Sequence, residues 1–497
     1  MKRALPSSFY NSLTLAGGAV AAVSFGLVLF LMLLESLSAA PKPYMGVIAF
    51  VLLPAILVLG LLLALVGVIR EHRRLRAGRP SEMHLPRVDM NDPRHRRAFL
   101  YVAGGLILLL LFSAFGSYQA YEHTDSDQFC GETCHKVMAP EYTAYQYSAH
   151  ARVGCVKCHI GPGADWFVRS KLSGTYQVYA TLFNKYPRPI PTPIENLRPA
   201  QETCEQCHWP MHFYSEKLLV NTYFLQDEHN TRWSLNLLVK IGGGNSEAGP
   251  TSGIHWHMNI ANQVTYAPAD STRQVIPWVQ VRRPDGSVSV YRSSDIPVSD
   301  EEVAKLPKRK MDCIDCHNRP THIYHPPARS VDHVMALGWV DPALPSIKSL
   351  AVKALEMPYA TQQGALDSIG AFIEESYRTQ YPQVAATQHA AIEQAIGEVR
   401  KIYARNYFPE MQVSWRRFPD NIGHMYYPGC FRCHDGKHLS EEGKVLSRDC
   451  NTCHTILAEE LSNDKLRLSL DGVEYKHPVD IGDAWKETNC SDCHSAQ

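Results

Sequence analysis

The stretch Cys155-Val-Lys-Cys-His159 decides the fold of this chain, because its spacing of two cysteines and a histidine recurs along the sequence. Six segments read C-x-x-C-H, and a seventh, C-G-E-T-C-H, has one extra residue between its cysteines. Together they use all 14 cysteines of the 497 residues. In chain order the first to seventh motifs are Cys130, Cys134 and His135; Cys155, Cys158 and His159; Cys204, Cys207 and His208; Cys313, Cys316 and His317; Cys430, Cys433 and His434; Cys450, Cys453 and His454; and Cys490, Cys493 and His494.

The C-x-x-C-H segment is the attachment signature of c-type haem, whose vinyl groups react with the two thiols while the histidine ligates the iron. Three other uses of cysteine fit less well. Structural zinc sites do not need a histidine after every second cysteine. A disulfide framework would not repeat one short spacing, and a thioredoxin-like C-x-x-C occurs once in a βαβ context. The motifs therefore predict seven covalent haems c and no disulfide.

Three uncharged apolar runs precede the motifs, at Ala4–Leu34, Pro43–Ile69 and Ala98–Ala120. Each exceeds the roughly 20 residues that a helix needs to cross a bilayer. We therefore expect a three-helix membrane anchor over residues 1–120, with a kink at Pro54 in the middle of the second run.

Arginines fix the expected orientation of this anchor. Loop 70–97, between the second and third runs, contains nine arginines, whereas the preceding loop has only Lys42 as a basic residue. The positive-inside rule makes the arginine-rich loop cytoplasmic. Everything after the third helix then lies outside the cytoplasm, where haem c is attached. We expect a three-pass protein of the bacterial inner membrane whose haem domain faces the periplasm.

The spacing of the motifs predicts the domain organisation of the periplasmic part. We expect the periplasmic part to be packed around haem and to consist mostly of helix and loop. Haem-rich and haem-free segments alternate along it. Val279–Val281 and Val288–Val290 flank Pro284-Asp285-Gly286, which is typical of a β-hairpin. This region is the one place where we expect a small sheet. The expected segments are a trihaem module at 121–210, a haem-free insertion at 211–312, the fourth haem with a helical segment at 313–429, and a C-terminal trihaem module at 430–497.

The helical segment contains an apolar stripe between Ala386 and Tyr403, which predicts a helix with one buried face. The chain between motifs is short, so we expect contact with haem to supply much of the packing.

Second axial ligands should come from histidines outside the motifs, several of which lie near a motif. His255 and His257 form an H-x-H that we place on a strand, and we expect one of the two to ligate. Met138 follows the first motif closely and is expected to ligate the first haem in place of a histidine. The other expected distal ligands are His150, His322, His424, His438 and His477. Haems with two such ligands suit electron transfer, because neither oxidation state needs a ligand change.

The third apolar run is followed by Tyr121-Glu-His-Thr-Asp-Ser, C-G-E-T-C-H-K-V-Met138, Ser148-Ala-His150 and C-V-K-C-H. This succession resembles the NapC/NirT family of membrane-anchored cytochromes. The resemblance covers residues 98–210. It implies oxidation of membrane quinol, menaquinol included, by haems just outside the anchor. The extra residue in the first motif departs from the family pattern.

Quinol oxidation releases two protons and needs an acceptor near the membrane. Glu122, Asp125 and Asp127 lie between the third run and the first motif. The resemblance adds Asp165 and Lys171, which match positions of polar quinol-site residues in the family. We expect one of these five residues to accept a proton.

Charge limits the choice of partner. Of the 49 basic and 49 acidic residues, 12 and 5 lie in the first 97, so the remainder is acidic by 7. A nucleic-acid surface is therefore excluded, whereas a basic patch on a periplasmic cytochrome fits an acidic domain. The sequence leaves three functions open: a quinol dehydrogenase of anaerobic respiration that reduces periplasmic c-type cytochromes, a terminal reductase of a small oxyanion or sulfur compound, and an electron conduit for a separate quinol-oxidising subunit.

Overall fold

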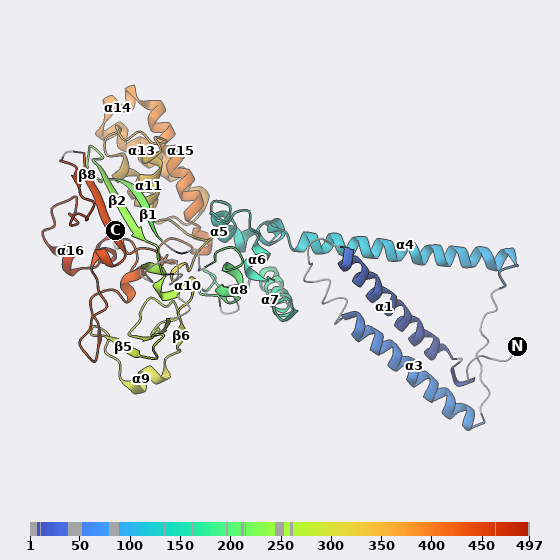
Figure 1. The fold of residues 1–497 in the computed structure, drawn as a ribbon. Coiled ribbons are helices and arrows are strands. Elements are labelled where there is room, and N and C mark those ends of the chain that lie inside the picture. The colour runs from blue at the N-terminus through green and yellow to red at the C-terminus, as the bar shows by residue number, and fades with distance from the viewer. Residues whose placement is uncertain are drawn as a thin grey trace. The chain divides into compact units, whose positions relative to one another are not determined.

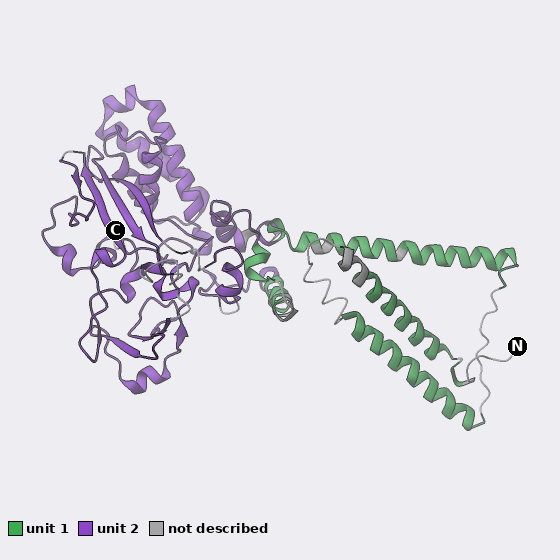
Figure 2. Cartoon of the chain, in the orientation of Figure 1, with its two compact units in different colours: residues 1–129, 155–179 green, residues 130–154, 180–497 purple. Residues whose placement is uncertain are grey.

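The computed structural model describes residues 7–9, 11–37, 52–78, 89–133, 135–161, 164–194, 197–209, 213, 215–243, 253–258, 262–462 and 464–495 (Figure 1). The chain forms two compact units (Figure 2). The first contains residues 1–129 and 155–179, and the second contains residues 130–154 and 180–497.

Among the described residues, three helices are long and apolar enough to cross a membrane, as the apolar runs predicted. They are α1 (Ser12–Leu37), α3 (Leu53–Arg76) and α4 (Pro93–Thr124), and the turn η1 (Ser7–Phe9) precedes α1. The expected kink at Pro54 stays a prediction, because residues 43–51 of the second run lie outside the described residues. Pro54 lies in the first turn of α3, where a missing backbone N–H costs no helical hydrogen bond.

Helices α1 and α3 pack against each other through glycine. A Cβ on Gly17 would lie 2.4 Å from the backbone nitrogen of Ala64, and one on Gly60 would lie 2.8 Å from that of Ala21. Side-chain hydrogen bonds add to this contact, because Asn11 Nδ2 donates to the carbonyl oxygen of Gly67 at 3.2 Å. Small residues let helix backbones approach closely where lipid supplies no hydrophobic drive between helices.

Short helices follow α4. In chain order they are η3 (Phe129–Thr133), α5 (His135–Gln146), α6 (Cys155–His159), α7 (Ala164–Leu182) and α8 (Ala200–Cys204). Within the first unit, the amide of Cys155 at the start of α6 donates to Asp127 Oδ1 at 2.8 Å. Asp127 thereby satisfies one of the free amides that every helix N-terminus leaves.

Two antiparallel sheets lie in the second unit. The first has the order β1 (Glu216–Phe224), β2 (Arg232–Lys240), β8 (His454–Leu461) and β9 (Arg467–Leu468). The second has the order β6 (Arg309–Lys310), β3 (Gln263–Ala267), β4 (Trp278–Arg282), β5 (Val288–Ser293) and β7 (His438–Ser440). The hairpin predicted around Asp285-Gly286 is confirmed as β4–β5, with Arg282 opposite Val288 and Gly286 at a φ of +83°.

The sheets are larger than the sequence predicted. We expected one small sheet within residues 211–312, but strands from the regions of the fifth and sixth motifs complete both sheets. β8 begins at His454 of the sixth motif and pairs with β2, whereas β7 follows the fifth motif and pairs with β5. Strands more than 140 residues apart in sequence thus tie the motif regions to the haem-free insertion.

A helical subdomain fills the long segment between the fourth and fifth motifs. Its helices are α11 (Pro327–Ala336), α12 (Ile347–Glu356), α13 (Gln362–Gln380), α14 (Pro382–Thr387) and α15 (His389–Asn406). The predicted stripe is confirmed, because α15 buries Ile392, Ala395, Ile396, Val399 and Ile402. These side chains belong to a large apolar cluster that extends through α11, α12 and α13. The expectation that haem contacts dominate the packing is therefore wrong for this subdomain.

The remaining elements are short turns, several of which are the haem motifs themselves. They are η5 (Ile254–Met258), α9 (Asp300–Lys305), α10 (Cys313–Cys316), η6 (Pro409–Met411), η7 (Gly429–Arg432), η8 (Cys450–Thr452), α16 (Ala484–Glu487) and α17 (Cys490–His494).

Candidate haem-binding histidine pairs

Among the described residues, the second to seventh motifs each form or begin in a short helical turn. In the third, fourth and fifth motifs the histidine amide donates to the carbonyl oxygen of the first cysteine, at 2.8, 2.8 and 3.0 Å. Such a turn brings both thiols and the imidazole to one side of the chain. Cys134 and the side chain of His135 in the first motif lie outside the described residues.

Five motif histidines each face a histidine from elsewhere in the second unit. The separations of the ring centroids are 6.0 Å for His150–His208, 6.4 Å for His255–His317, 5.9 Å for His257–His434, 6.2 Å for His424–His454 and 6.2 Å for His477–His494. These pairs serve the third, fourth, fifth, sixth and seventh motifs in that order.

An iron between two imidazoles needs roughly 6 Å between the ring centres, because each nitrogen–metal bond is about 2 Å long and each centre lies about 1 Å behind its nitrogen. All five separations meet that requirement. Groups of three or more His, Cys, Asp or Glu that would hold a bare metal ion are absent from the described part of the chain. The residues present therefore fit an iron whose other donors come from a porphyrin.

Backbone carbonyls orient several of these rings. Nδ1 lies near a carbonyl oxygen in His255 (Ile241, 2.9 Å), His257 (Ile254, 2.9 Å), His434 (Ser447, 3.0 Å), His477 (Val479, 2.7 Å) and His150 (Pro320, 3.3 Å). A proton on Nδ1 that is held by a carbonyl fixes the tautomer and leaves Nε2 as the free donor.

Burial favours the neutral form of seven of the paired imidazoles. It lowers the pKa of His255, His257 and His454, and it lowers the pKa of His424 to about 4. The same cause lowers the pKa of His317, His434 and His494. Neutral imidazole is the form that binds a metal.

The H-x-H segment differs from the sequence expectation in two ways. It forms the 3₁₀ turn η5 instead of a strand, and its two rings point at two different motifs. Both histidines, not one, therefore face a motif histidine. A strand would have placed the two side chains on one face, whereas the tighter turn separates their directions.

His438 does not face a motif histidine among the described residues. Its Nδ1 lies 2.9 Å from Asp435 Oδ1, its Nε2 lies 2.8 Å from the carbonyl oxygen of Ile276, and the residue is 1% exposed. Burial lowers its pKa, but the hydrogen bonds to Asp435 and to the carbonyl oxygen of Ile276, together with the charges of Asp435 and Asp295, outweigh burial and raise the pKa. With both ring nitrogens engaged by protein, this arrangement contradicts the expectation that His438 ligates iron.

The candidates for the first two motifs are less completely described. His322 places Nδ1 3.0 Å from the carbonyl oxygen of Glu141 on α5, the helix that begins at His135. Met138 is half-buried on α5, three residues after His135 and hence on the same helix face. His159 is exposed by surface area at the end of α6, but desolvation by the surrounding chain lowers its pKa.

The proposed proton acceptors fall into three groups. Glu122 is exposed near the end of α4, and Asp125 is half-buried just after it. Asp127 holds the start of α6, as described above. Asp165 and Lys171 lie on α7, but their side chains are outside the described residues.

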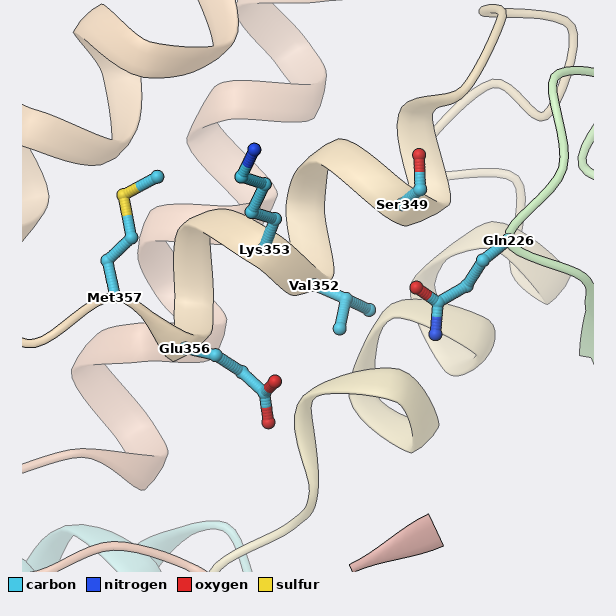
Figure 3. A pocket seen from close by; sticks show the side chains of 6 residues that line it. All are labelled: Gln226, Ser349, Val352, Lys353, Glu356 and Met357. Carbon is cyan, nitrogen blue, oxygen red and sulfur yellow. The ribbon is translucent and has the colours of Figure 1, made fainter. Parts of the chain in front are cut away.

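The pocket in Figure 3, of about 630 Å³, lies along α12 and is lined by Gln226, Ser349, Val352, Lys353, Glu356 and Met357. None of these residues is a motif cysteine, a motif histidine or a paired histidine. The pocket is therefore not part of the histidine site.

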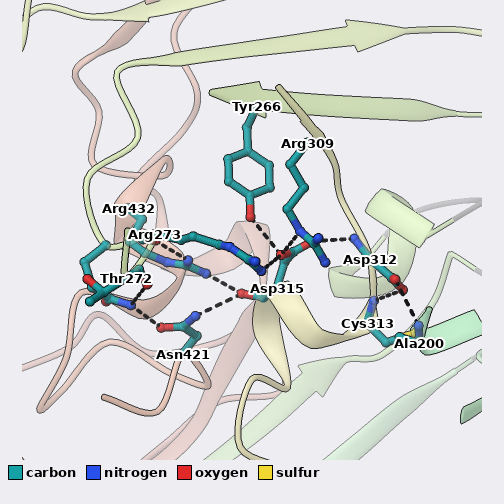
Figure 4. A network of polar contacts seen from close by, with 11 residues as sticks. Ala200, Tyr266, Thr272, Arg273, Arg309, Asp312, Cys313, Asp315, Asn421 and Arg432 are labelled. Carbon is teal, nitrogen blue, oxygen red and sulfur yellow. Dashed lines mark hydrogen bonds and ion pairs between the residues drawn. The ribbon is translucent and has the colours of Figure 1, made fainter. Parts of the chain in front are cut away.

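Sequence reasoning missed the buried polar network that surrounds the fourth motif (Figure 4). Its centre is Asp315, the residue before the second cysteine of that motif. The D in C-I-D-C-H was the only sequence signal for it, and that position has no role in haem attachment.

Comparison with known proteins supports the interpretation of the motifs. Residues 93–190 match the model of the NapC/NirT cytochrome c family, N-terminal region. The chain is 46% identical over 488 residues to cytochrome c-type protein ImcH of Geobacter sulfurreducens, an alignment that covers 98% of this chain and 95% of that protein. No solved structure matches the chain significantly. From its motifs, its apolar helices and this similarity, the chain belongs to the NapC/NirT family of membrane-anchored multihaem cytochromes, which bind haem c covalently.

Proposed function

We propose that this protein is a seven-haem cytochrome of the inner membrane that oxidises quinol, menaquinol in particular, in anaerobic respiration. Electrons then pass along the haems to c-type cytochromes in the periplasm. The five facing histidine pairs are the observation that supports this function best. Iron with both axial positions filled exchanges electrons without a change of ligand.

Seven motifs supply the thiols for seven haems. We assign the distal positions of the third to seventh haems to His150, His255, His257, His424 and His477. Met138, which is half-buried on α5 three residues after His135, is our candidate ligand of the first iron. His322, beside α5, serves the first or second haem. The motif histidines supply the remaining axial bonds.

The orientation follows from the arginines at the cytoplasmic ends of the second and third spans. Arg73, Arg74 and Arg76 lie in the last turn of α3, and Arg94, Arg96 and Arg97 lie in the first turns of α4. With these ends in the cytoplasm, the C-terminal end of α4 and all the motifs lie in the periplasm.

Quinol oxidation gives a quinone, two electrons and two protons. Haem would accept the electrons one at a time, and a carboxylate at the membrane surface would accept the protons. Glu122 and Asp125 are the best placed of the five candidates, because Asp127 already accepts a helix amide. Asp165 and Lys171 remain candidates on the basis of family resemblance.

A terminal reductase would need an iron with an open axial position. The five facing pairs leave no such position at the third to seventh motifs. The geometry therefore favours electron transfer over reduction of a small substrate.

The test uses the purified full-length protein in lipid nanodiscs. Addition of a menaquinol analogue should reduce the haems, which absorbance follows directly. Asp125→Asn and Glu122→Gln are then compared with Asp471→Asn, a change at an exposed loop residue. We expect at least one of the first two to slow reduction by quinol about tenfold or more while reduction by dithionite stays unchanged. A wild-type protein that dithionite reduces but quinol does not would contradict the proposed function and favour a conduit for another subunit.

A further inference from the structure

The fourth and fifth motifs are joined to each other by side chains that take no part in haem attachment. Arg432, the residue before the second cysteine of C-F-R-C-H, donates from Nη2 to the carbonyl oxygen of Asp315 at 2.7 Å (Figure 4). Asp315 occupies the same place in C-I-D-C-H. Arg432 Nη1 and Nε also donate to the carbonyl oxygens of Arg273 and Gly429, both at 2.9 Å. One guanidinium therefore binds both motif turns.

Asp315 is itself held on every side. Its carboxylate is 1% exposed and accepts hydrogen bonds from Tyr266 Oη, Arg309 Nε and the amide of Asp312, each at 2.7 Å. Arg273 Nη1 lies 3.5 Å away. These donors come from β3, β6, the loop after β3 and the start of α10 (Figure 4). A buried carboxylate is stable only with such complete pairing.

One element, η5, also supplies the histidines that face the fourth and the fifth motif. His255 and His257 of η5 face His317 of the fourth motif and His434 of the fifth. Trp256, between them, and Cys433 of the fifth motif pack against the same buried cluster. The backbone beside the turn is tight, because a Cβ on Gly243 would lie 2.3 Å from the amide nitrogen of Trp256.

The charge around Asp315 is unbalanced. Arg273 and Arg309 contact the buried carboxylate, and Arg432 binds the backbone carbonyl oxygen of Asp315. These three guanidinium groups outnumber the carboxylates of Asp315 and Asp312, which both act on Arg309. Charges in a poorly solvated site act strongly on one another, and an added electron is stabilised by nearby positive charge. Removal of the carboxylate would leave the guanidinium groups uncompensated and would make reduction of adjacent haems more favourable.

We propose that the fourth and fifth haem sites form one rigid pair, and that Asp315 is the positioning residue that holds the pair together and tunes both haems. η5 fixes the two distal ligands relative to each other, and the contact of Arg432 with Asp315 fixes the two motif turns. The proposal rests on haem attachment at both motifs. It does not depend on quinol as the electron donor.

The test is a redox titration of the full-length holoprotein that carries Asp315→Asn. Absorbance and EPR monitor the reduction of the haems. The ring planes are nearly parallel in His255–His317, at 5°, and nearly perpendicular in His257–His434, at 85°, so the two haems give different EPR envelopes. We expect one component of each envelope to move to higher potential. Asp492→Asn is the matched control, because Asp492 has the same place in C-S-D-C-H of the seventh motif but is exposed. It should leave all potentials unchanged.

Three results would each overturn the proposal. They are unchanged potentials in Asp315→Asn, a shift of one haem alone in Asp315→Asn, and equal shifts in Asp492→Asn. If Asp315→Asn fails to accumulate as holoprotein, Arg432→Lys replaces it. Lysine keeps the charge, but its single nitrogen cannot reach the three carbonyl oxygens that Nε, Nη1 and Nη2 of Arg432 bind. Both haems should therefore still shift. Wild-type potentials in Arg432→Lys would be a refutation of equal weight. All of these readouts use dithionite or electrode potentials, so failure of quinol oxidation does not affect them.

Discussion

Ring orientation is the residue-scale property that distinguishes the histidine pairs from one another. The planes are close to perpendicular in His150–His208 (79°) and His257–His434 (85°), and they lie nearer to parallel in His255–His317 (5°), His424–His454 (18°) and His477–His494 (35°). Parallel and perpendicular axial imidazoles split the iron d orbitals by different amounts. The angle between the two rings is therefore visible in the EPR spectrum of the oxidised haem.

EPR of the fully oxidised protein should therefore show two haems of the strongly anisotropic low-spin type and at least three of the rhombic low-spin type. The variant His257→Ala should remove one anisotropic component, whereas His255→Ala should remove one rhombic component. A spectrum that contains only rhombic signals would contradict the ring geometry of the third and fifth sites.

His438 has a structural role, in contrast to the paired histidines that we propose as haem ligands. The Asp435 hydrogen bond raises its pKa above the unfolded value, so its contribution to stability is complete below about pH 6.5 and is lost as the pH rises through the folded pKa. In His438→Ala the free energy of unfolding should fall by about 1–3 kcal/mol, and by more at low pH than at high pH.

Thermal unfolding at several pH values measures this difference, and absorbance spectra provide the second readout. His438→Ala should keep all its haems low-spin, whereas His424→Ala should convert one to high-spin. A high-spin haem in His438→Ala would restore His438 as a ligand.

Helix α7 exposes large apolar and aromatic side chains that the rest of the fold does not cover. Leu172, Tyr176, Tyr179 and Leu182 follow one stripe of the helix and are 69%, 63%, 43% and 76% exposed. The stripe begins fewer than 50 residues after α4 ends, and both helices belong largely to the first unit (Figure 2). Amphipathic helices rich in Tyr and Leu on one face bind at the headgroup boundary of a bilayer.

We expect α7 to contact lipid. In nanodiscs that contain a phospholipid with a photoactivatable acyl chain, mass spectrometry should find lipid adducts on α7 as well as on the three long helices. Leu470, 89% exposed in the loop after β9, is the matched control and should gain none. Adducts confined to α1, α3 and α4 would exclude this contact, and protein–protein crosslinks through α7 would indicate a second copy instead.

Local patterns in the sequence predicted those elements whose stability is local. The stripe of α15, the Asp285-Gly286 hairpin and the three apolar helices were each visible within one window of sequence. The pairing of β2 with β8 and of β5 with β7 was not, because it depends on contacts over more than 140 residues. The direction of the two rings of η5 depends on the same long-range packing.

At the scale of the whole molecule, topology follows from the loop between α3 and α4. A reporter that is active only outside the cytoplasm should be silent when it is fused after Gly78, which follows α3, and active when it is fused at the C-terminus. Activity after Gly78 would reverse the orientation and would place the motifs where haem c is not attached.

The mass of the denatured protein tests whether the seven motifs hold seven covalent haems. Thioether bonds survive denaturation, so the intact mass should exceed that of the polypeptide by seven haems, and no thiol should react with an alkylating reagent, since all 14 cysteines lie in motifs. A mass with fewer haems, or with free thiols at Cys130 and Cys134, would contradict the account.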